Sequence, residues 1–263
     1  MYTILIFIFF GLGVIIGSFL NVVILRYNTH KTFGGRSACM SCRQTLEWYE
    51  LIPLFSFLGL KGRCRTCKTK ISIQYPAVEL ATGIIFALIY YKFANLLFLN
   101  NLAFPISFGY FAVVFSLLLV IAVYDLKHKI IPDLLVLIFG ILSFLSLFLF
   151  KDYIYYPHFP AILELFSGLI LALPFALLWF VSAGKWMGFG DAKLAVGMGY
   201  LVGLGGGFSS IMIASVLGSV VGVYLMLTSK KYGMKTELPF APFLVLGVFV
   251  VFMYECNFFS LAF

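Results

Sequence analysis

The sequence predicts an all-α polytopic membrane protein, with about eight transmembrane helices and a small cytosolic loop domain between the first two. Three observations lead to this prediction. Hydrophobic residues make up 63% of the 263 residues and charged residues only 11%, whereas soluble domains average roughly 45–50% and about 25%. Thirty-one residues are Phe. Largely uncharged segments long enough to cross a bilayer recur along the chain. This composition excludes a disordered chain, a collagen and a soluble α/β enzyme.

The predicted spans follow from the need for about 20 apolar residues to cross the hydrocarbon core. No basic residue precedes Arg26, which favours a retained first helix over a cleaved secretory signal. Four glycines between Gly203 and Gly207 favour a turn between two helices over one long helix. The expected spans are 2–25, 76–94, 104–124, 131–150, 164–183, 191–204, 207–228 and 239–256.

The basic residues predict the orientation, because cytoplasmic loops of membrane proteins are enriched in Lys and Arg. With both termini outside, all but two of the 18 basic residues lie on the cytosolic side, and Lys92 and Lys151 lie outside. A seven-span arrangement would move three lysines outside: Lys230, Lys231 and Lys235. The net charge of +8 is therefore interpreted as an orientation signal and not as a sign of nucleic-acid binding.

The polar segment 26–75 carries two CxxC pairs, Cys39 with Cys42 and Cys64 with Cys67. Two such turns can supply the four thiolates of a tetrahedral zinc site, and an all-cysteine site leaves no open position for water, so we expect a structural zinc-binding loop domain. Two disulfides are the alternative, but a cytosolic loop keeps its thiols reduced. Nearby basic residues also favour thiolates. These are Arg36, Arg43, Lys61, Arg63, Arg65 and Lys68.

Four acidic residues are expected at the cytosolic edge of the spans, where an ionisable side chain is a functional candidate by default: Glu79, Asp125, Asp133 and Asp191. Asp133 follows Pro132 and also suits the first turn of a helix. Asp125 is expected at a helix C-terminus, where the helix dipole disfavours a carboxylate, so its position calls for another reason.

Asp191 follows two glycines, Gly188 and Gly190, and could likewise be a helix-start residue. Paired with Asp125 it could form a dyad that shares a proton and activates a water against a peptide carbonyl. The two residues lie 66 positions apart in the sequence, and spacing alone does not show that they meet.

Several further motifs occur in order along most of the chain. They are Gly17-Ser18-Phe19-Leu20-Asn21-Val22, the two CxxC pairs, Leu46-Glu47-Trp48, Ile52-Pro53-Leu54, Gly62-Arg63-Cys64, Tyr75-Pro76-Ala77-Val78-Glu79-Leu80, Asp125 with Ile131-Pro132-Asp133, Gly188-Phe189-Gly190-Asp191-Ala192-Lys193-Leu194 and Pro239-Phe240-Ala241-Pro242-Phe243. With these motifs the chain resembles the type IV prepilin leader peptidases, a family of bacterial membrane aspartic proteases with a GxGD motif.

The resemblance implies an inner-membrane enzyme that cuts the short basic leader from prepilins or pseudopilins at the cytoplasmic face, just before their apolar helix. It maps the catalytic aspartates to Asp125 and Asp191. Many members then methylate the new N-terminus with S-adenosylmethionine, although no GxGxxG-type loop marks the methyl-donor site, which stays unknown. The implied division is a first helix over 1–25, a four-cysteine zinc domain over 26–75 and a transmembrane aspartic peptidase domain over 76–263. Candidate supporting residues for substrate or dyad are Gly188, Gly190, Lys193, Asp133 and Glu79.

Other functions stay open from the sequence. The enzyme could be a peptidase without methylation. Intramembrane acids and Gly-broken spans also occur in ion-coupled transporters, but the acids here are expected at the membrane edge and no inverted repeat is visible. The four-cysteine loop argues against presenilin-like proteases and archaeal preflagellin peptidases. A zinc-bearing scaffold for pilus assembly is a further alternative. The sequence specifies neither the pilin served nor the oligomeric state.

Overall fold

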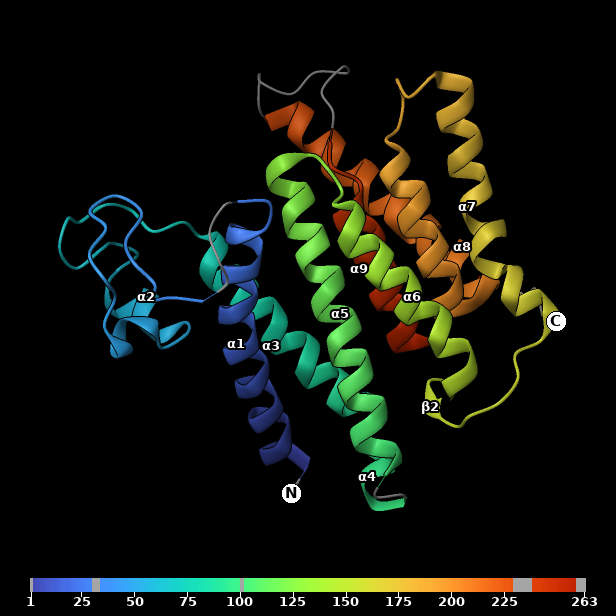
Figure 1. Ribbon diagram of the computed structural model, residues 1–263, viewed down its shortest axis with the longest axis horizontal. Coiled ribbons are helices and arrows are strands. Elements are labelled where there is room, and N and C mark those ends of the chain that lie inside the picture. Colours follow the sequence, from blue (N-terminus) through green and yellow to red (C-terminus); the bar gives the residue numbers. More distant parts are fainter. Residues whose placement is uncertain (1, 30–33, 100–101, 229–237, 259–263) are drawn as a thin grey trace. The chain divides into compact units, whose positions relative to one another are not determined.

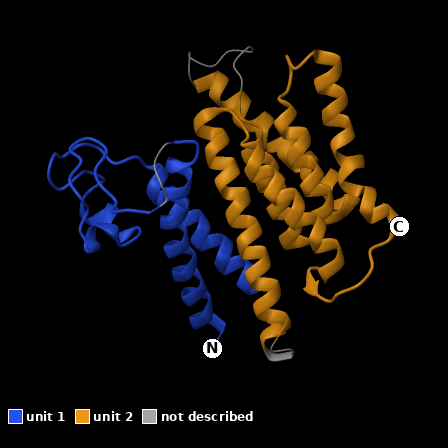
Figure 2. Ribbon diagram, in the orientation of Figure 1, with its two compact units in different colours: residues 1–94 blue, residues 95–263 orange. Residues whose placement is uncertain are grey.

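The computed structural model describes residues 2–29, 34–99, 102–228 and 238–258. The chain forms two compact units, residues 1–94 and residues 95–263, shown in two colours in Figure 2. Helices dominate both units, as the composition predicts. Four lysines used to predict the orientation lie outside the described residues: Lys31, Lys230, Lys231 and Lys235.

The first unit is built on two apolar helices, α1 (Tyr2–Arg26) and α3 (Gln74–Phe93), which pack along each other (Figure 1). Their contact depends on small residues, which let helix backbones approach closely in membranes. A side-chain carbon added at Gly17 would lie 2.8 Å from the Cα of Glu79. Between the two helices the chain forms the short helices η1 (Trp48–Leu51) and α2 (Phe55–Gly59).

The second unit is a bundle of apolar helices. Its elements are α4 (Leu96–Leu99), α5 (Ala103–His128), α6 (Asp133–Leu149), α7 (Ile162–Ser182), α8 (Phe189–Thr228) and α9 (Ala241–Tyr254). The longest helix, α8, packs against α6, α7 and α9, and α9 also packs against α5. A two-stranded antiparallel hairpin, β1 (Phe150–Lys151) and β2 (Ile154–Tyr155), connects α6 to α7. The alternating direction of the helices places the end of α5 and the starts of α6 and α8 together.

Helix α8 is two helices joined at Gly203, whose backbone angles of φ 71° and ψ 177° are not helical. This confirms the predicted break within the glycine-rich segment, because a positive φ is a conformation that glycine adopts readily. The buried residues of α8 all lie between Asp191 and Ala214, so its C-terminal part packs less tightly than the rest.

Each of the eight predicted spans coincides with one of these helices, counting the two parts of α8 separately. Among the described residues five helices are long and apolar enough to cross a membrane, and α6 and α9 are shorter, with 17 and 14 residues. The fold-class prediction is confirmed. The hairpin at residues 150–155 was not predicted. Its strands are two residues long, too short for an alternating pattern to appear in the sequence.

Candidate active site and metal centre

Asp125 lies in the last turn of α5 with only 5% of its surface exposed. The helix ends at His128, and the next residue, Lys129, adopts a left-handed conformation and donates its N–H to the Asp125 carbonyl at 2.7 Å. Another helix, α9, compensates for the unfavourable position of this carboxylate at the C-terminus of α5. The backbone N–H of Ala241, the first residue of α9, donates to the Asp125 carboxylate. The positive end of the α9 dipole therefore offsets the negative end of α5.

Asp191 is the third residue of α8 and has 7% of its surface exposed. Its backbone N–H donates to the Gly188 carbonyl at 3.3 Å, which fixes the glycine turn to the helix start. Its carboxylate is near enough to that of Asp125 for the two charges to interact. The fold thus brings together two carboxylates that are far apart in the sequence. One of their oxygens, the Asp191 Oδ1 atom, is buried without a hydrogen-bond partner among the described residues.

A second set of contacts joins the start of α6 to the start of α8. A side-chain carbon added at Gly190 would lie 2.8 Å from the Cβ of Ile131, so the chain segments touch directly at that glycine. The Lys193 ammonium donates to the Asp133 carboxylate at 2.7 Å and lies 5.4 Å from the centre of the Phe189 ring. Asp133 is the first residue of α6. The starts of α6 and α8 are therefore held to each other by a small-residue contact and by an ion pair.

Glu79 belongs to the first unit, on α3, and only 6% of its surface is exposed. Its carboxylate accepts a hydrogen bond from the Leu54 backbone N–H at 2.8 Å. Leu54 has φ 60° and ψ −50°, which a residue with a side chain rarely adopts, so this charge-assisted bond supports a strained turn. In the same unit the Asn21 amide donates to the Tyr75 carbonyl at 3.0 Å. A role of Glu79 in substrate binding stays a prediction, because its carboxylate serves the fold of the loop segment.

The four cysteines of the loop lie together, with their sulfur atoms within 4.8 Å of one another. None forms a disulfide. A tetrahedral site with metal–sulfur bonds of about 2.3 Å requires sulfur atoms about 3.8 Å apart. The Cys39 and Cys67 sulfur atoms are 3.8 Å apart. The residues therefore fit a four-thiolate metal site.

The two cysteine turns have the same backbone pattern. The N–H of the first cysteine donates to the carbonyl five residues later, Cys39 to Gln44 and Cys64 to Thr69, at 2.9 Å in both turns. In the other direction, Arg43 and Lys68 donate to the carbonyls of these cysteines at 2.9 and 3.0 Å. Arg43 and Lys68 also share a positive φ, 57° and 58°. Two equivalent turns thus present their thiols to one point.

Hydrogen bonds favour the ionised form of two of the four thiols, Cys39 and Cys67, whereas the pKa of Cys42 is raised to about 11 by burial and by hydrogen bonds with the other three cysteines. A side-chain bond from Thr69, at 3.2 Å, and that residue's backbone N–H lower the pKa of Cys67 to about 6. Backbone N–H groups of Cys42 and Ser41 lower the pKa of Cys39. Since a metal binds the thiolate, each turn has one thiol whose ionised form is already favoured.

One residue of the candidate active site, Ala241, was quoted within the Pro239–Phe243 motif but was not predicted to be a site residue. Its contribution is a backbone N–H, which every residue except proline carries, so its residue type gives no signal. The only available signal was its position between Pro239 and Pro242, since proline is favoured in the first turn of a helix. That pattern indicates a helix N-terminus but not what the N-terminus faces.

Comparisons with known proteins place the chain among relatives of similar sequence. A family profile described as the bacterial peptidase A24 N-terminal domain matches residues 12–93, and one described as the type IV leader peptidase family matches residues 112–223. No solved structure matches the chain.

Three curated relatives have similar coverage. The prepilin leader peptidase/N-methyltransferase of Xanthomonas campestris pv. campestris is 34% identical, over 93% of this chain and 89% of its own length. The protein of the same name in Bacillus subtilis is 32% identical, over 94% of this chain and 93% of its own length. The type 4 prepilin-like proteins leader peptide-processing enzyme of Escherichia coli O78:H11 is 33% identical, over 89% and 88%.

Proposed function

Because the chain belongs to the type IV leader peptidase family, we propose that it removes the leader peptide from a prepilin or pseudopilin and then methylates the new N-terminus. As a member of this family with several membrane-spanning helices, it is a multi-pass inner-membrane enzyme. The observation that carries the proposal is that two buried carboxylates, Asp125 and Asp191, lie near enough for their charges to interact. A scaffold gives no reason for this pairing, and an ion-coupled transporter would place its acids near the midplane of the bilayer and not at helix ends.

The proposed reaction is peptide hydrolysis by the aspartate pair. Two carboxylates in a buried site share one proton, because both cannot be ionised at low cost. The ionised group takes a proton from a water molecule while the water oxygen bonds to the scissile carbonyl carbon. The protonated group gives its proton to the leaving nitrogen as the carbon–nitrogen bond breaks. The Asp191 Oδ1 atom has no hydrogen-bond partner among the described residues, so it is free to hydrogen-bond with a water or a substrate group in the site.

The two carboxylates differ in their hydrogen bonding, because the Ala241 N–H donates to Asp125 and not to Asp191. A hydrogen bond to a carboxylate stabilises its ionised form. We therefore assign the ionised, water-activating role to Asp125 and the protonated role to Asp191 before the chemical step.

The orientation follows from the charge distribution. With both termini outside, the active site faces the cytosol, on the side that holds the basic loop residues. The substrate then presents its basic leader in the cytosol and its apolar helix in the bilayer.

The loop domain, we propose, holds a structural zinc ion through Cys39, Cys42, Cys64 and Cys67. Four cysteine ligands fill the tetrahedron and leave no position for substrate. A bound zinc ion would stabilise a segment whose buried core is small. S-adenosylmethionine would supply the methyl group when bound. No glycine-rich turn follows either short strand in the described part of the chain, so the structure assigns no residue to that donor.

The function is tested by co-expression with a candidate prepilin. Mass spectrometry should show loss of the leader and, with isotopically labelled methyl donor, one labelled methyl group on the new N-terminus. Cleavage without label would restrict the protein to peptidase activity. An uncut prepilin, tried across pilus and secretion systems of the same host, would contradict the proposal.

The Lys193–Asp133 ion pair is expected to position the aspartates without taking part in the reaction. An exposed pair contributes at most about 1 kcal/mol to stability, and the two side chains are 39% and 76% exposed, so Lys193→Met should fold normally. A displacement of about 1 Å at a catalytic group, however, costs about 100-fold in rate. We expect kcat to fall by about 10- to 100-fold with KM little changed.

The matched control is Lys185→Met, which removes an exposed lysine just before α8. The charge-swapped double variant, Asp133→Lys with Lys193→Asp, should recover part of the lost kcat. Equal kcat values in Lys193→Met and Lys185→Met proteins would refute the positioning role.

A further inference from the structure

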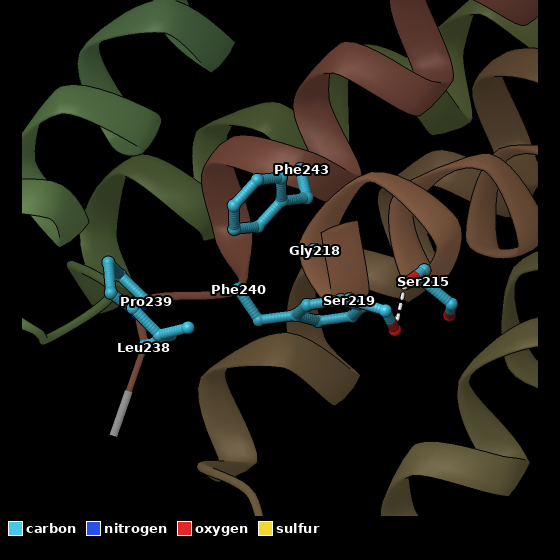
Figure 3. Close-up of a pocket in the computed structure, with 7 residues that line it drawn as sticks. All are labelled: Ser215, Gly218, Ser219, Leu238, Pro239, Phe240 and Phe243. Atoms are coloured by element: carbon cyan, nitrogen blue, oxygen red, sulfur yellow. Dashed lines mark hydrogen bonds between the residues drawn. The ribbon is translucent and has the colours of Figure 1, made fainter. Parts of the chain in front are cut away.

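A groove lies between the C-terminal part of α8 and the start of α9 (Figure 3). Its volume is about 320 Å³. One wall comes from α8, and the other comes from the first turn of α9 and the segment that leads into it. The lining residues are Ser215, Gly218, Ser219, Leu238, Pro239, Phe240 and Phe243.

The groove has one apolar wall and one wall that carries two serines. The Ser219 hydroxyl donates to the Ser215 carbonyl at 2.7 Å, and the Ser215 hydroxyl donates to the Ile211 carbonyl at 2.8 Å. Both protons are thus used within α8. The opposite wall consists of two phenylalanine rings, a proline and a leucine. An occupant of this groove needs apolar side chains and few hydrogen-bonding groups.

The α8 wall suits an approaching helix in particular. Its small residues Ser215, Gly218, Ser219 and Gly222 recur at helical spacing and therefore lie on one face. Small residues on a membrane helix let a second helix pack closely. No residue of α8 beyond Ala214 is buried, so this part of the helix has room for a further partner.

The groove and the candidate active site share one chain segment, at the start of α9. Phe240 and Phe243, which line the groove, lie on either side of Ala241 in the sequence. The Ala241 N–H donates to the carboxylate of Asp125. An apolar segment in the groove would therefore have its end within reach of the aspartate pair. A lipid chain would gain nothing from this placement, whereas a substrate helix with its scissile bond at one end requires it.

We propose that this groove binds the apolar helix of the prepilin at the residues that directly follow the scissile bond. The inference rests on the proposed peptidase function and names the surface that selects the substrate. The aspartates perform the cleavage, and the groove sets which peptide bond reaches them. The binding energy of the helix is then used to place the bond, so a peptide without the helix is cut less well.

The proposal is tested by filling the groove. A side-chain carbon at Gly218 would lie 3.5 Å from the Phe243 ring and 3.7 Å from the Phe240 ring, so Gly218→Leu adds bulk between the walls. Two substrates are compared: an intact prepilin in detergent micelles, and a short peptide that spans the scissile bond but lacks the helix. The kcat/KM value for the intact prepilin, divided by that for the short peptide, should fall about tenfold in Gly218→Leu. This is the size expected for a lost apolar contact.

The matched control is Val220→Leu, which adds bulk to an exposed side chain of the same helix that does not line the groove. It should leave the ratio unchanged. Ser219→Leu, a second groove variant, keeps the test valid if Gly218→Leu fails to fold. Ratios equal to wild type in the folded groove variants would overturn the proposal. Wild-type protein that cuts neither substrate would show that the peptidase function itself fails.

Cross-linking identifies the occupant directly. A photo-reactive amino acid at position 219, in an Asp191→Asn protein that holds uncut substrate, should form a product with the first residues of the prepilin helix. The same group at position 220 should not. Products at position 219 that contain only lipid would overturn the proposal in favour of a lipid site.

Discussion

Replacing Asp191 with asparagine is expected to abolish leader removal while the protein stays folded and in the membrane. Asparagine keeps the size of the side chain and its position in the first turn of α8, but it cannot hold or release the proton that hydrolysis requires. Loss of general acid–base catalysis typically lowers a rate by about 100- to 10,000-fold. Asp125→Asn should have an effect of the same order, because the two carboxylates act as one unit. Prepilin cleavage by purified protein, followed by mass spectrometry, measures the effect.

The matched control for both variants is Asp152→Asn, a change of the same kind at an exposed residue between β1 and β2. Asp152 has φ 49°, a conformation that asparagine tolerates, so this protein should cleave at the wild-type rate. Normal cleavage by either Asp125→Asn or Asp191→Asn would refute the dyad. Loss of activity together with loss of folded protein in the membrane would show a structural role for the carboxylate instead.

Removing any one of the four loop cysteines is expected to cost the protein its metal. Purified wild-type protein should contain about one zinc ion per chain, as a site with four thiolates predicts. Cys67→Ala should bring that content close to zero. The loop has few buried side chains, so we also expect it to become sensitive to proteases, because metal binding and folding are coupled in such segments. Elemental analysis and limited proteolysis measure the two effects.

Cys256→Ala provides the control, because Cys256 is the fifth cysteine and does not belong to the cluster. It should leave both the zinc content and the protease resistance unchanged. A full complement of zinc in the Cys67→Ala protein would refute the site. Zinc loss with an intact, resistant loop would show that the ion does not stabilise the fold.

Much of the architecture could be predicted because it depends on local patterns. Apolar segments of bilayer length indicated the spans, and the glycines from Gly203 to Gly207 indicated the break in α8. The cysteine cluster was also predictable, since each CxxC turn brings two sulfurs together on its own. Only the contact between the two turns joins residues far apart in the sequence, and the preference of zinc for four ligands gives a reason to expect it. The short hairpin was missed because its strands are too brief to carry a periodic signal.

The sequence by itself determined the chemistry available to this protein: two acids beside apolar spans, four thiols in a basic loop, and a glycine turn before Asp191. Only the tertiary structure decided which groups act on each other. It brought Asp191 close to Asp125, faced Asp125 with the start of α9, paired Lys193 with Asp133 and opened a groove beside Phe240. The physical reason is that these contacts arise from helix packing across long sequence separations. Packing depends on the shapes of whole helix faces and on backbone groups that every residue shares, so no local pattern records it.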